Sequence, residues 1–268
     1  DWCSYNPELE AYRGSSDWDP SSRPNITYAG GDDLTKARVP FERMYEALRQ
    51  QPRDIVYSLC QYGMGNVWEW GPEVGGNSWR TTQDITDTWG SMSGIGFRQD
   101  GLEKYAGPGH FNDPDMLVIG KVGWGPQLHD TRLSPNEQYT HISLWCLLAS
   151  PLLIGCDMTQ LDEFTLNLLT NDEVLEVNQD PLGCQASRIT QDGKLEVWAK
   201  DMEDGSKAVG LFNRGQRDQT VTVNWSDLGI SGEQTVRDMW RQKDLGKYTG
   251  KFEANVGRHG VVLVKIAP

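Results

Sequence analysis

The sequence lacks three features that would assign it to common functional classes. No apolar run reaches the roughly 18 residues of a membrane-spanning helix, and the longest, residues 144–154, is interrupted by Ser150 and Pro151. Lysine and arginine do not cluster and the net charge is −13, so no nucleic-acid partner is expected. No cysteines form a CxxC pair and the four histidines are scattered, so neither a metal site nor a cofactor is predicted.

Cysteine usage and two sequons bear on the compartment. The number of cysteines is odd, which leaves at least one unpaired within the chain: Cys3, Cys60, Cys146, Cys156 and Cys184. Residues 25–27 and 224–226 have the form of N-glycosylation sequons, and the pI is about 4.7. Together these features favour a secreted or extracellular glycoprotein, with a vacuolar or lysosomal one as the alternative.

The first two thirds of the chain alternate helical and strand-like patterns. Proline at the first position and one apolar face predict a helix over residues 40–50, and a capping box at Ser134 and Glu137 predicts another to about Leu148. Strands are predicted over residues 54–59, 79–84, 111–118 and 150–154. This alternation is typical of a parallel βα array.

From residue 185 the pattern becomes one of short alternating runs separated by turn signals. Strands are predicted over residues 195–199, 208–212, 220–223, 235–238 and 261–266. We therefore predict an α/β chain in two parts. The C-terminal part of a (β/α)8 TIM barrel occupies residues 1–182, and an antiparallel β-sandwich domain occupies residues 183–268.

Candidate functional residues fall where parallel strands are predicted to end, which is where barrel enzymes carry their chemistry. Asp1 and Asp84 are two such carboxylates, and glycoside hydrolysis uses one as nucleophile or base and one as acid. An aspartate at a strand end can also be a helix cap. Arg80 either binds a sugar hydroxyl or forms a structural ion pair. Aromatic side chains near these positions either line a sugar site or belong to the core: Tyr62, Trp68, Trp70 and Trp79.

Four motifs resemble glycoside hydrolase family 27, which contains α-galactosidases and α-N-acetylgalactosaminidases. They appear in the family's order at residues 57–63 (YSLCQYG), 77–84 (NSWRTTQD), 106–117 (AGPGHFNDPDML) and 178–183 (NQDPLG). The resemblance covers the whole chain. It implies a barrel followed by an antiparallel β domain, and a retaining mechanism through a covalent glycosyl-enzyme.

The resemblance also implies residue roles. Asp1, in the segment Asp1-Trp2-Cys3, matches the nucleophile, and Asp84 matches the acid/base. Arg80 matches a residue near the sugar 2-hydroxyl, and Asp115 and Met116 match positions that line the pocket. We expect the carboxyl groups of Asp1 and Asp84 to lie about 5–7 Å apart, close to the spacing of retaining enzymes.

Substrate choice in this family depends on the loop that contains Cys60, Gln61 and Tyr62. A cysteine beside a bulky aromatic resembles the galactosidase arrangement, in which both crowd the 2-position, so the expected partner is a galactose-containing oligosaccharide. Gln61 departs from the glutamate of plant members. This departure leaves rarer family specificities open, such as β-L-arabinopyranosides or isomalto-oligosaccharides. The α-N-acetylgalactosaminidase specificity and a non-catalytic carbohydrate-binding fragment are further alternatives.

The chain begins at the position that matches the nucleophile. About 100–130 preceding residues are therefore expected to complete the barrel. The resemblance places the partner of Cys3 among them, and we expect Cys60 to be free because Gly76 stands where some members have its partner. Alone, residues 1–268 are expected to be insoluble or inactive, since a carboxylate at a frayed terminus is poorly held.

Overall fold

The computed structural model describes residues 5–6, 11–12, 35–123 and 125–268. Asp1, Cys3 and the sequon at residues 25–27 lie outside this part of the chain, so the expectations placed on them stay predictions. Two short strands, β1 (Tyr5–Asn6) and β2 (Ala11–Tyr12), pair in antiparallel fashion near the N-terminus.

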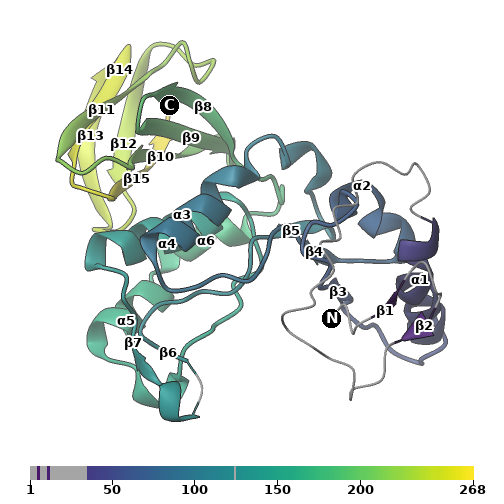
Figure 1. Cartoon of the computed structure of the whole chain (residues 1–268). Coiled ribbons are helices and arrows are strands. Elements are labelled where there is room, and N and C mark those ends of the chain that lie inside the picture. The colour runs from purple at the N-terminus through teal and green to yellow at the C-terminus, as the bar shows by residue number, and fades with distance from the viewer. Residues whose placement is uncertain (1–4, 7–10, 13–34, 124) are drawn as a thin grey trace.

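A three-stranded parallel sheet carries the barrel-like part (Figure 1). Its order is β3 (Ser58–Leu59), β4 (Ser78–Arg80) and β5 (Phe111–Asp113). Leu59 pairs with Trp79, and Trp79 pairs with Asn112, so the three strands end at the same edge. The predicted strand over residues 150–154 is reduced to one parallel bridge between Leu117 and Ile154. The parallel βα arrangement was predicted correctly, but its strands are shorter than expected.

Helices follow the strands. In chain order they are α1 (Thr35–Arg49), α2 (Val67–Trp70), α3 (Trp89–Gly96), α4 (Pro135–Leu147), α5 (Glu163–Leu169) and α6 (Asp172–Gln179). The capping box of α4 is confirmed, because the Ser134 backbone N–H donates to Glu137 Oε2 at 2.8 Å. The start of the first helix was predicted wrongly at Pro40, which lies inside α1. Proline has a helical φ, but inside a helix it removes one backbone hydrogen bond and its ring crowds the carbonyl four residues earlier, so the turn before Pro40 forms at a cost in free energy.

Eight strands form the C-terminal β domain: β8 (Ser187–Asp192), β9 (Leu195–Asp201), β10 (Lys207–Asn213), β11 (Gln219–Asn224), β12 (Glu233–Asp238), β13 (Lys243–Thr249), β14 (Lys251–Val256) and β15 (Val261–Ala267). Six of them pair in the order β13-β12-β15-β10-β9-β8, and β11 pairs with β14. All these pairings are antiparallel, and a shared apolar core lies between the two sheets. The predicted antiparallel β domain is therefore present.

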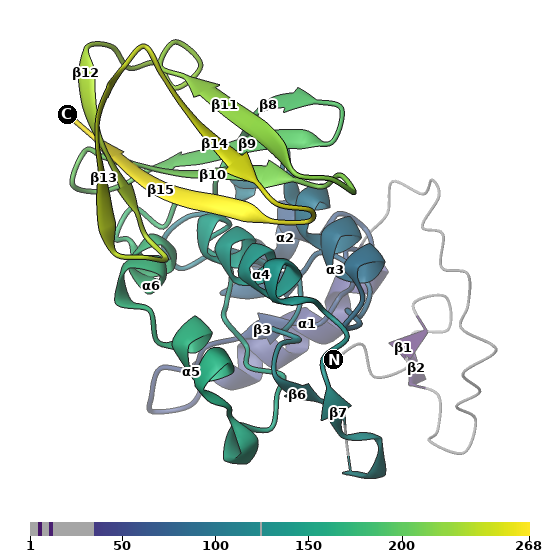
Figure 2. The same ribbon diagram turned by 90° about the vertical axis from the view of Figure 1, so that its left-hand side faces the viewer.

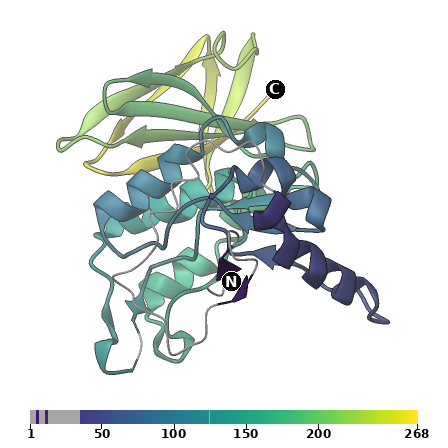
Figure 3. The same ribbon diagram turned by 45° about the vertical axis from the view of Figure 1, so that its right-hand side comes forward.

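The β domain packs on the helices rather than hanging from a linker (Figure 2). A single apolar cluster joins Trp145 and Leu147 of α4 to Trp198, Phe212 and Leu263 of the sheet. All five side chains are at most 1% exposed. Figure 3 shows that α1 lies on the side of the molecule away from this contact. The barrel-like part and the β domain therefore share one core.

A buried polar cluster completes the contact between the two parts. His259, in the loop before β15, is 2% exposed and its ring stacks on Trp89 with centroids 4.0 Å apart. Its Nδ1 lies 2.6 Å from Glu137 Oε1, and its Nε2 lies 2.9 Å from Gln216 Nε2. Hydrogen bonding to His259 lowers the pKa of Glu137 against the opposing effect of burial. The capping glutamate of α4 is thereby fixed to the β domain.

Candidate active site

Three polar segments leave the parallel sheet at its carboxyl edge. Residues 60–62 follow β3, residues 81–84 follow β4, and Asp115 and Met116 follow β5. The register aligns Arg80 with Asp113, and the Gly63 backbone N–H donates to the Arg80 carbonyl at 2.9 Å. The structure thus brings the predicted residues of these segments together, as expected for strands that end at one edge.

Arg80 is the centre of this edge. Its side chain is 9% exposed, and Nη2 lies 2.9 Å from Asp115 Oδ2 and 3.2 Å from Asp84 Oδ1. The same nitrogen donates to the Thr82 carbonyl at 3.2 Å. Nε is buried and has no hydrogen-bond partner among the described residues. One guanidinium therefore fixes two carboxylates from two neighbouring strand ends.

Asp115 holds the cluster together, and both oxygens of its carboxyl group already have hydrogen-bond partners. Its Oδ2 also accepts the Ile85 backbone N–H at 2.8 Å, and its Oδ1 accepts the Met116 backbone N–H at 2.7 Å. The Trp145 indole donates to its carbonyl at 2.7 Å. Its φ is +87°, a conformation that costs a non-glycine residue free energy and is retained where surrounding contacts impose it. These contacts give Asp115 the role of holding Arg80, while its predicted contact with sugar stays a prediction.

Asp84 is the accessible carboxylate of the cluster. Its side chain is 64% exposed, against 11% for Asp115 and 9% for Arg80. Its Oδ1 faces Arg80, and no other hydrogen bond to its carboxyl group occurs among the described residues. An oriented carboxyl group with a free oxygen can exchange a proton with a bound molecule, which is the requirement for a general acid or base.

Tyr62 contacts Arg80, and Cys60 lies beside Tyr62. The Arg80 Cζ is 5.4 Å from the centroid of the Tyr62 ring, within the range of a cation–π contact. Burial and a hydrogen bond with Cys60 raise the pKa of Tyr62. Cys60 is half-buried and its thiol is free, as predicted. Tyr62 has a φ of +57°, so the backbone turns sharply at this aromatic residue.

Gln61 is more deeply buried than its neighbours Cys60 and Tyr62. Its side chain is completely buried, and neither Oε1 nor Nε2 has a hydrogen-bond partner among the described residues. A buried amide without partners costs about 1–3 kcal/mol per unpaired group, so such groups usually bind an ordered water or a group elsewhere in the protein. Gln61 is therefore a buried polar position in this structure, and its predicted contact with substrate stays a prediction.

Met116 directly follows Asp115 in the segment after β5. It is half-buried, and a Cβ at Gly155 would come within 2.6 Å of its sulfur. Gly155 therefore leaves the space that this side chain occupies. Met116 packs against the main core, which fixes its position beside Asp115.

Asp113, the last residue of β5, is a further carboxylate that the sequence did not single out. It is 1% exposed, and its Oδ1 accepts the Asp115 backbone N–H at 2.8 Å. Burial raises the pKa of Asp113 to about 6, while that hydrogen bond and Arg80 act in the opposite direction. Asp113 therefore combines a structural role at the strand end with an unfavourable charge at neutral pH.

Replacing Asp113 with asparagine should change how stability depends on pH. The folded-state pKa of about 6 exceeds the unfolded value of 3.8, so the folded protein binds more protons between these values and its stability falls as pH rises through this window. Two pKa units correspond to about 3 kcal/mol at most. Urea unfolding should show Asp113→Asn gaining stability relative to wild type between pH 4 and pH 7.

The matched control is Asp130→Asn, which neutralises a side chain that is 85% exposed. The difference in free energy of unfolding between Asp130→Asn and wild type should not increase between pH 4 and pH 7 as it does for Asp113→Asn. A pH-independent difference for Asp113→Asn would show that the carboxyl group is not forced to ionise while buried.

The neighbouring tryptophans belong mainly to the core. Trp79 is 0% exposed and Trp70 is 3% exposed, and both lie in the cluster formed with α1, while Trp68 packs against it. The Trp79 indole donates to Asn112 Oδ1 at 2.8 Å. Of the two interpretations of these aromatic residues, the core one is correct for Trp70 and Trp79.

A buried amide network behind the site was not predicted. Asn112 Nδ2 donates to Gln185 Oε1 at 2.8 Å, and Gln185 Nε2 donates to the Gln99 carbonyl at 2.9 Å. The network joins β5 to the segment that leads into the β domain. The partners are up to 86 residues apart in sequence, so no local pattern indicates the pairing.

The described residues contain no cluster of three or more histidine, cysteine or acidic side chains arranged to hold a metal ion. Among the same residues, no helix has both the length and the apolar character needed to cross a membrane. The functional groups that the described residues place at the sheet edge are carboxylates, one arginine, a thiol and a phenol.

The parallel sheet, with its polar cluster at the strand ends, places the chain among the barrel proteins that carry their sites on the carboxyl face. Two family models match it. "Alpha galactosidase A" matches residues 25–180, and "Alpha galactosidase C-terminal beta sandwich domain" matches residues 192–266. The chain belongs to the α-galactosidase family, glycoside hydrolase family 27.

The chain is similar to α-galactosidases of plants. An α-galactosidase of Oryza sativa is 40% identical over 230 residues, covering 85% of this chain and 52% of the relative. α-Galactosidase 3 of Arabidopsis thaliana is also 40% identical, with the same two coverages. The chain thus spans about half the length of these curated relatives.

Solved structures agree with the fold. A putative α-galactosidase/melibiase of Bacteroides fragilis matches with a TM-score of 0.81 at 32% identity, covering 90% of this chain and 53% of the other. A family 27 β-L-arabinopyranosidase of Geobacillus stearothermophilus matches with a TM-score of 0.78 at 32% identity, covering 85% and 53%. These relatives support the partial barrel and the β-sandwich that the sequence predicted.

Proposed function

We propose that this chain contributes Asp84 and Arg80 to the active site of a retaining exo-α-galactosidase. The whole protein would release terminal α-D-galactosyl residues from oligosaccharides or glycoconjugates. The observation that carries the proposal is the ion-paired cluster of Arg80, Asp84 and Asp115 at one strand edge. The 40% identity to plant α-galactosidases supports the same substrate class.

In the proposed reaction Asp84 is the acid/base. Its protonated carboxyl group gives a proton to the glycosidic oxygen as the bond to the anomeric carbon breaks, and a second carboxylate attacks that carbon from the opposite face. Asp84 then removes a proton from the water that releases the sugar. The motif match assigns the nucleophile to Asp1, which lies outside the described residues.

Hydrolysis of three p-nitrophenyl glycosides tests the proposal: the α-galactoside, the α-N-acetylgalactosaminide and the β-L-arabinopyranoside. The α-galactoside should have the highest kcat/KM. A preference for the arabinopyranoside would instead match the Geobacillus stearothermophilus structure, which this chain resembles at 32% identity. No hydrolysis of any of the three by the folded whole protein would contradict the proposed enzyme class.

Tyr62 is proposed to set the preference at the sugar 2-position. Its ring faces Arg80 at 5.4 Å, and Cys60 lies beside it, so a bulky acetamide would press against a packed wall. Tyr62→Ser should raise the ratio of N-acetylgalactosaminidase to galactosidase kcat/KM by about tenfold or more, which corresponds to about 1.4 kcal/mol or more. Tyr62→Phe, which keeps the ring, should leave the ratio near that of wild type. An unchanged ratio for a folded Tyr62→Ser protein would place the specificity elsewhere.

We also propose that the protein is a secreted or vacuolar glycoprotein. Asn224, the last residue of β11, is exposed, as is Ser226 in the same sequon. The Asn224 amide donates only to Asp227 Oδ2, at 2.9 Å, within the described residues, so it lies at an accessible turn. Disulfide bonding is proposed only for Cys3, because Cys60, Cys146, Cys156 and Cys184 carry free thiols.

A further inference from the structure

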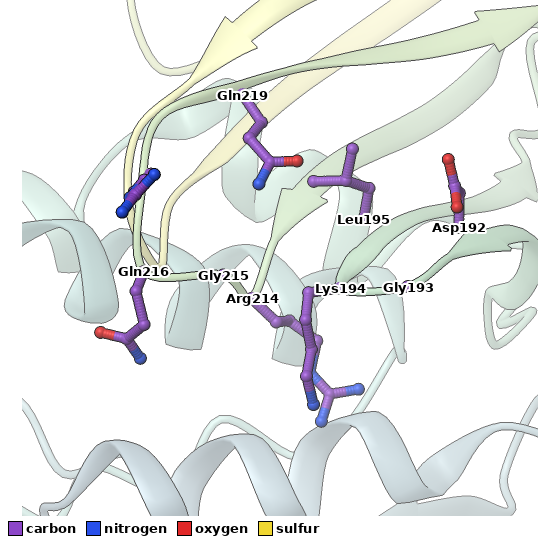
Figure 4. Close-up of a pocket in the computed structure, with 9 residues that line it drawn as sticks. Asp192, Gly193, Lys194, Leu195, Arg214, Gly215, Gln216 and Gln219 are labelled. Atoms are coloured by element: carbon purple, nitrogen blue, oxygen red, sulfur yellow. The ribbon is translucent and has the colours of Figure 1, made fainter.

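A pocket of about 530 Å³ opens on the β domain, and none of its lining residues belongs to the parallel sheet. The turn between β8 and β9 forms one side, and the connection between β10 and β11 forms the other (Figure 4). The volume lies within the range of about 300–1,000 Å³ that small-molecule sites occupy and far exceeds that of a single inorganic ion. The pocket therefore has room for a small organic molecule.

The pocket is cationic on an acidic protein. Lys194, Arg214 and Arg217 line it against one carboxylate, Asp192, although the chain has a net charge of −13. Neither Lys194 nor Arg217 forms a salt bridge within the described residues. Cations without a carboxylate partner in the lining of a pocket attract anions.

Arg214 is held rigidly in this pocket. Its Nη1 forms an ion pair with the fully buried Glu196, and its Cζ lies 4.4 Å from the centroid of the Phe97 ring. Glu196 also faces Arg188, whose Nη1 lies 3.7 Å from Glu196 Oε2. Arg188 pairs more closely with Asp100, at 2.6 Å, so Glu196 is mainly the partner of Arg214. A guanidinium fixed in this way loses little entropy when it binds a further anion.

Lys194 lies directly beside Arg214. The Arg214 backbone N–H donates to the Lys194 carbonyl at 2.8 Å, and both side chains extend from the loops in the same direction (Figure 4). Two adjacent positive charges repel each other, and an oxyanion between them converts that repulsion into attraction. Gln219 enters from the opposite side and offers an amide that can bind a hydroxyl group.

We propose that this pocket binds a carboxylate-bearing sugar, with the carboxylate between Lys194 and Arg214 and ring hydroxyls toward Gln219. The sugar part of this assignment rests on the proposed glycosidase function, while the carboxylate part rests on the charges of the pocket. The lining residues include no aromatic ring on which a neutral sugar would stack. A neutral galactose unit therefore lacks both an ionic and a stacking contact here.

The test is a titration of the whole protein, labelled with ¹⁵N, followed by NMR at low ionic strength. The probes are D-galacturonate, D-galactose and inorganic sulfate, and the signals followed are the backbone amides of Gly193 and Gly215 in the pocket. Galacturonate should shift these signals with saturation, galactose should not, and sulfate should bind at least tenfold more weakly. Lys194→Met should weaken galacturonate binding at least fivefold, whereas Lys247→Met, the same change on β13, should leave it unchanged.

The other outcomes contradict the proposal. Equal binding of galactose and galacturonate would remove the role of the carboxylate, and sulfate binding as tightly as galacturonate would reduce the pocket to a general anion site. Unchanged affinity in Lys194→Met would show that the probe binds elsewhere. Hydrolysis of p-nitrophenyl α-galactoside is measured in parallel, so loss of pocket binding with activity retained is distinguished from failure of the proposed glycosidase function.

Discussion

Replacing Asp84 with asparagine is expected to slow hydrolysis of a poorly activated α-galactoside by about 10²- to 10⁴-fold. An alkyl galactoside needs a proton on its leaving oxygen, and the Asp84 carboxyl group, exposed and oriented by Arg80 at 3.2 Å, is placed to supply it. The dinitrophenolate of a dinitrophenyl galactoside leaves without protonation. Formation of the glycosyl-enzyme from this substrate should therefore be slowed far less. The measurement is kcat/KM for both substrates.

Azide sharpens this test of Asp84. It attacks a glycosyl-enzyme without needing a base, so it should restore turnover of the dinitrophenyl substrate in Asp84→Asn and yield a galactosyl azide. Asp130→Asn, which neutralises an exposed carboxylate, should leave both substrates unaffected. Equal losses on the two substrates, with no effect of azide, would contradict the assignment of Asp84 as the acid/base.

The elements that the sequence predicted well are those with strong local signals. The capping box at Ser134 located the start of α4 because the side chain of Glu137 satisfies a nearby backbone N–H. Five strands of the β domain were predicted because they alternate or are continuously apolar. Local chemistry was sufficient in each of these cases.

One missed strand lacks such a signal. Strand β13 (Lys243–Thr249) contains charged residues and a glycine, and most of its side chains are exposed. Its position comes from pairing with β12, which a single segment does not reveal. The start of α1 was also missed, because Pro40 indicated the first residue of a helix, whereas α1 begins at Thr35.

The sequence predicted that these candidate residues gather at one sheet edge, but it did not predict the contacts that hold them there. Placement of Arg80, Asp84 and Asp115 at strand ends followed from the βα pattern, and the structure unites them in one ion-paired cluster. Tertiary contacts decide which carboxylate is buried and held, Asp115, and which is exposed, Asp84. The Trp145 indole that holds the Asp115 carbonyl comes from α4, 30 residues later, and the burial of Gln61 reflects packing that periodicity does not record.

Replacing Arg80 with methionine is expected to lower the free energy of unfolding by about 3–5 kcal/mol. Methionine is similar in length and keeps the packing of the aliphatic stem, but it removes the only cation that pairs with Asp115 in the described residues. Asp115 is 11% exposed and held by two backbone N–H groups, so it cannot turn toward solvent. The protein would keep a buried carboxylate without a counter-charge, and urea unfolding at pH 7 measures the loss.

The control for this prediction is Arg237→Met in the β domain. Arg237 also bridges two carboxylates, Glu173 at 2.6 Å and Asp244 at 2.8 Å, but its side chain is 34% exposed. Solvent screens such a pair, so its removal should cost about 1 kcal/mol or less. The double variant Arg80→Met with Asp115→Asn should recover part of the stability lost in Arg80→Met, because the unpaired charge is gone. Equal losses for the two single variants, or no recovery in the double variant, would show that Arg80 stabilises the site through packing rather than by balancing the charge of Asp115.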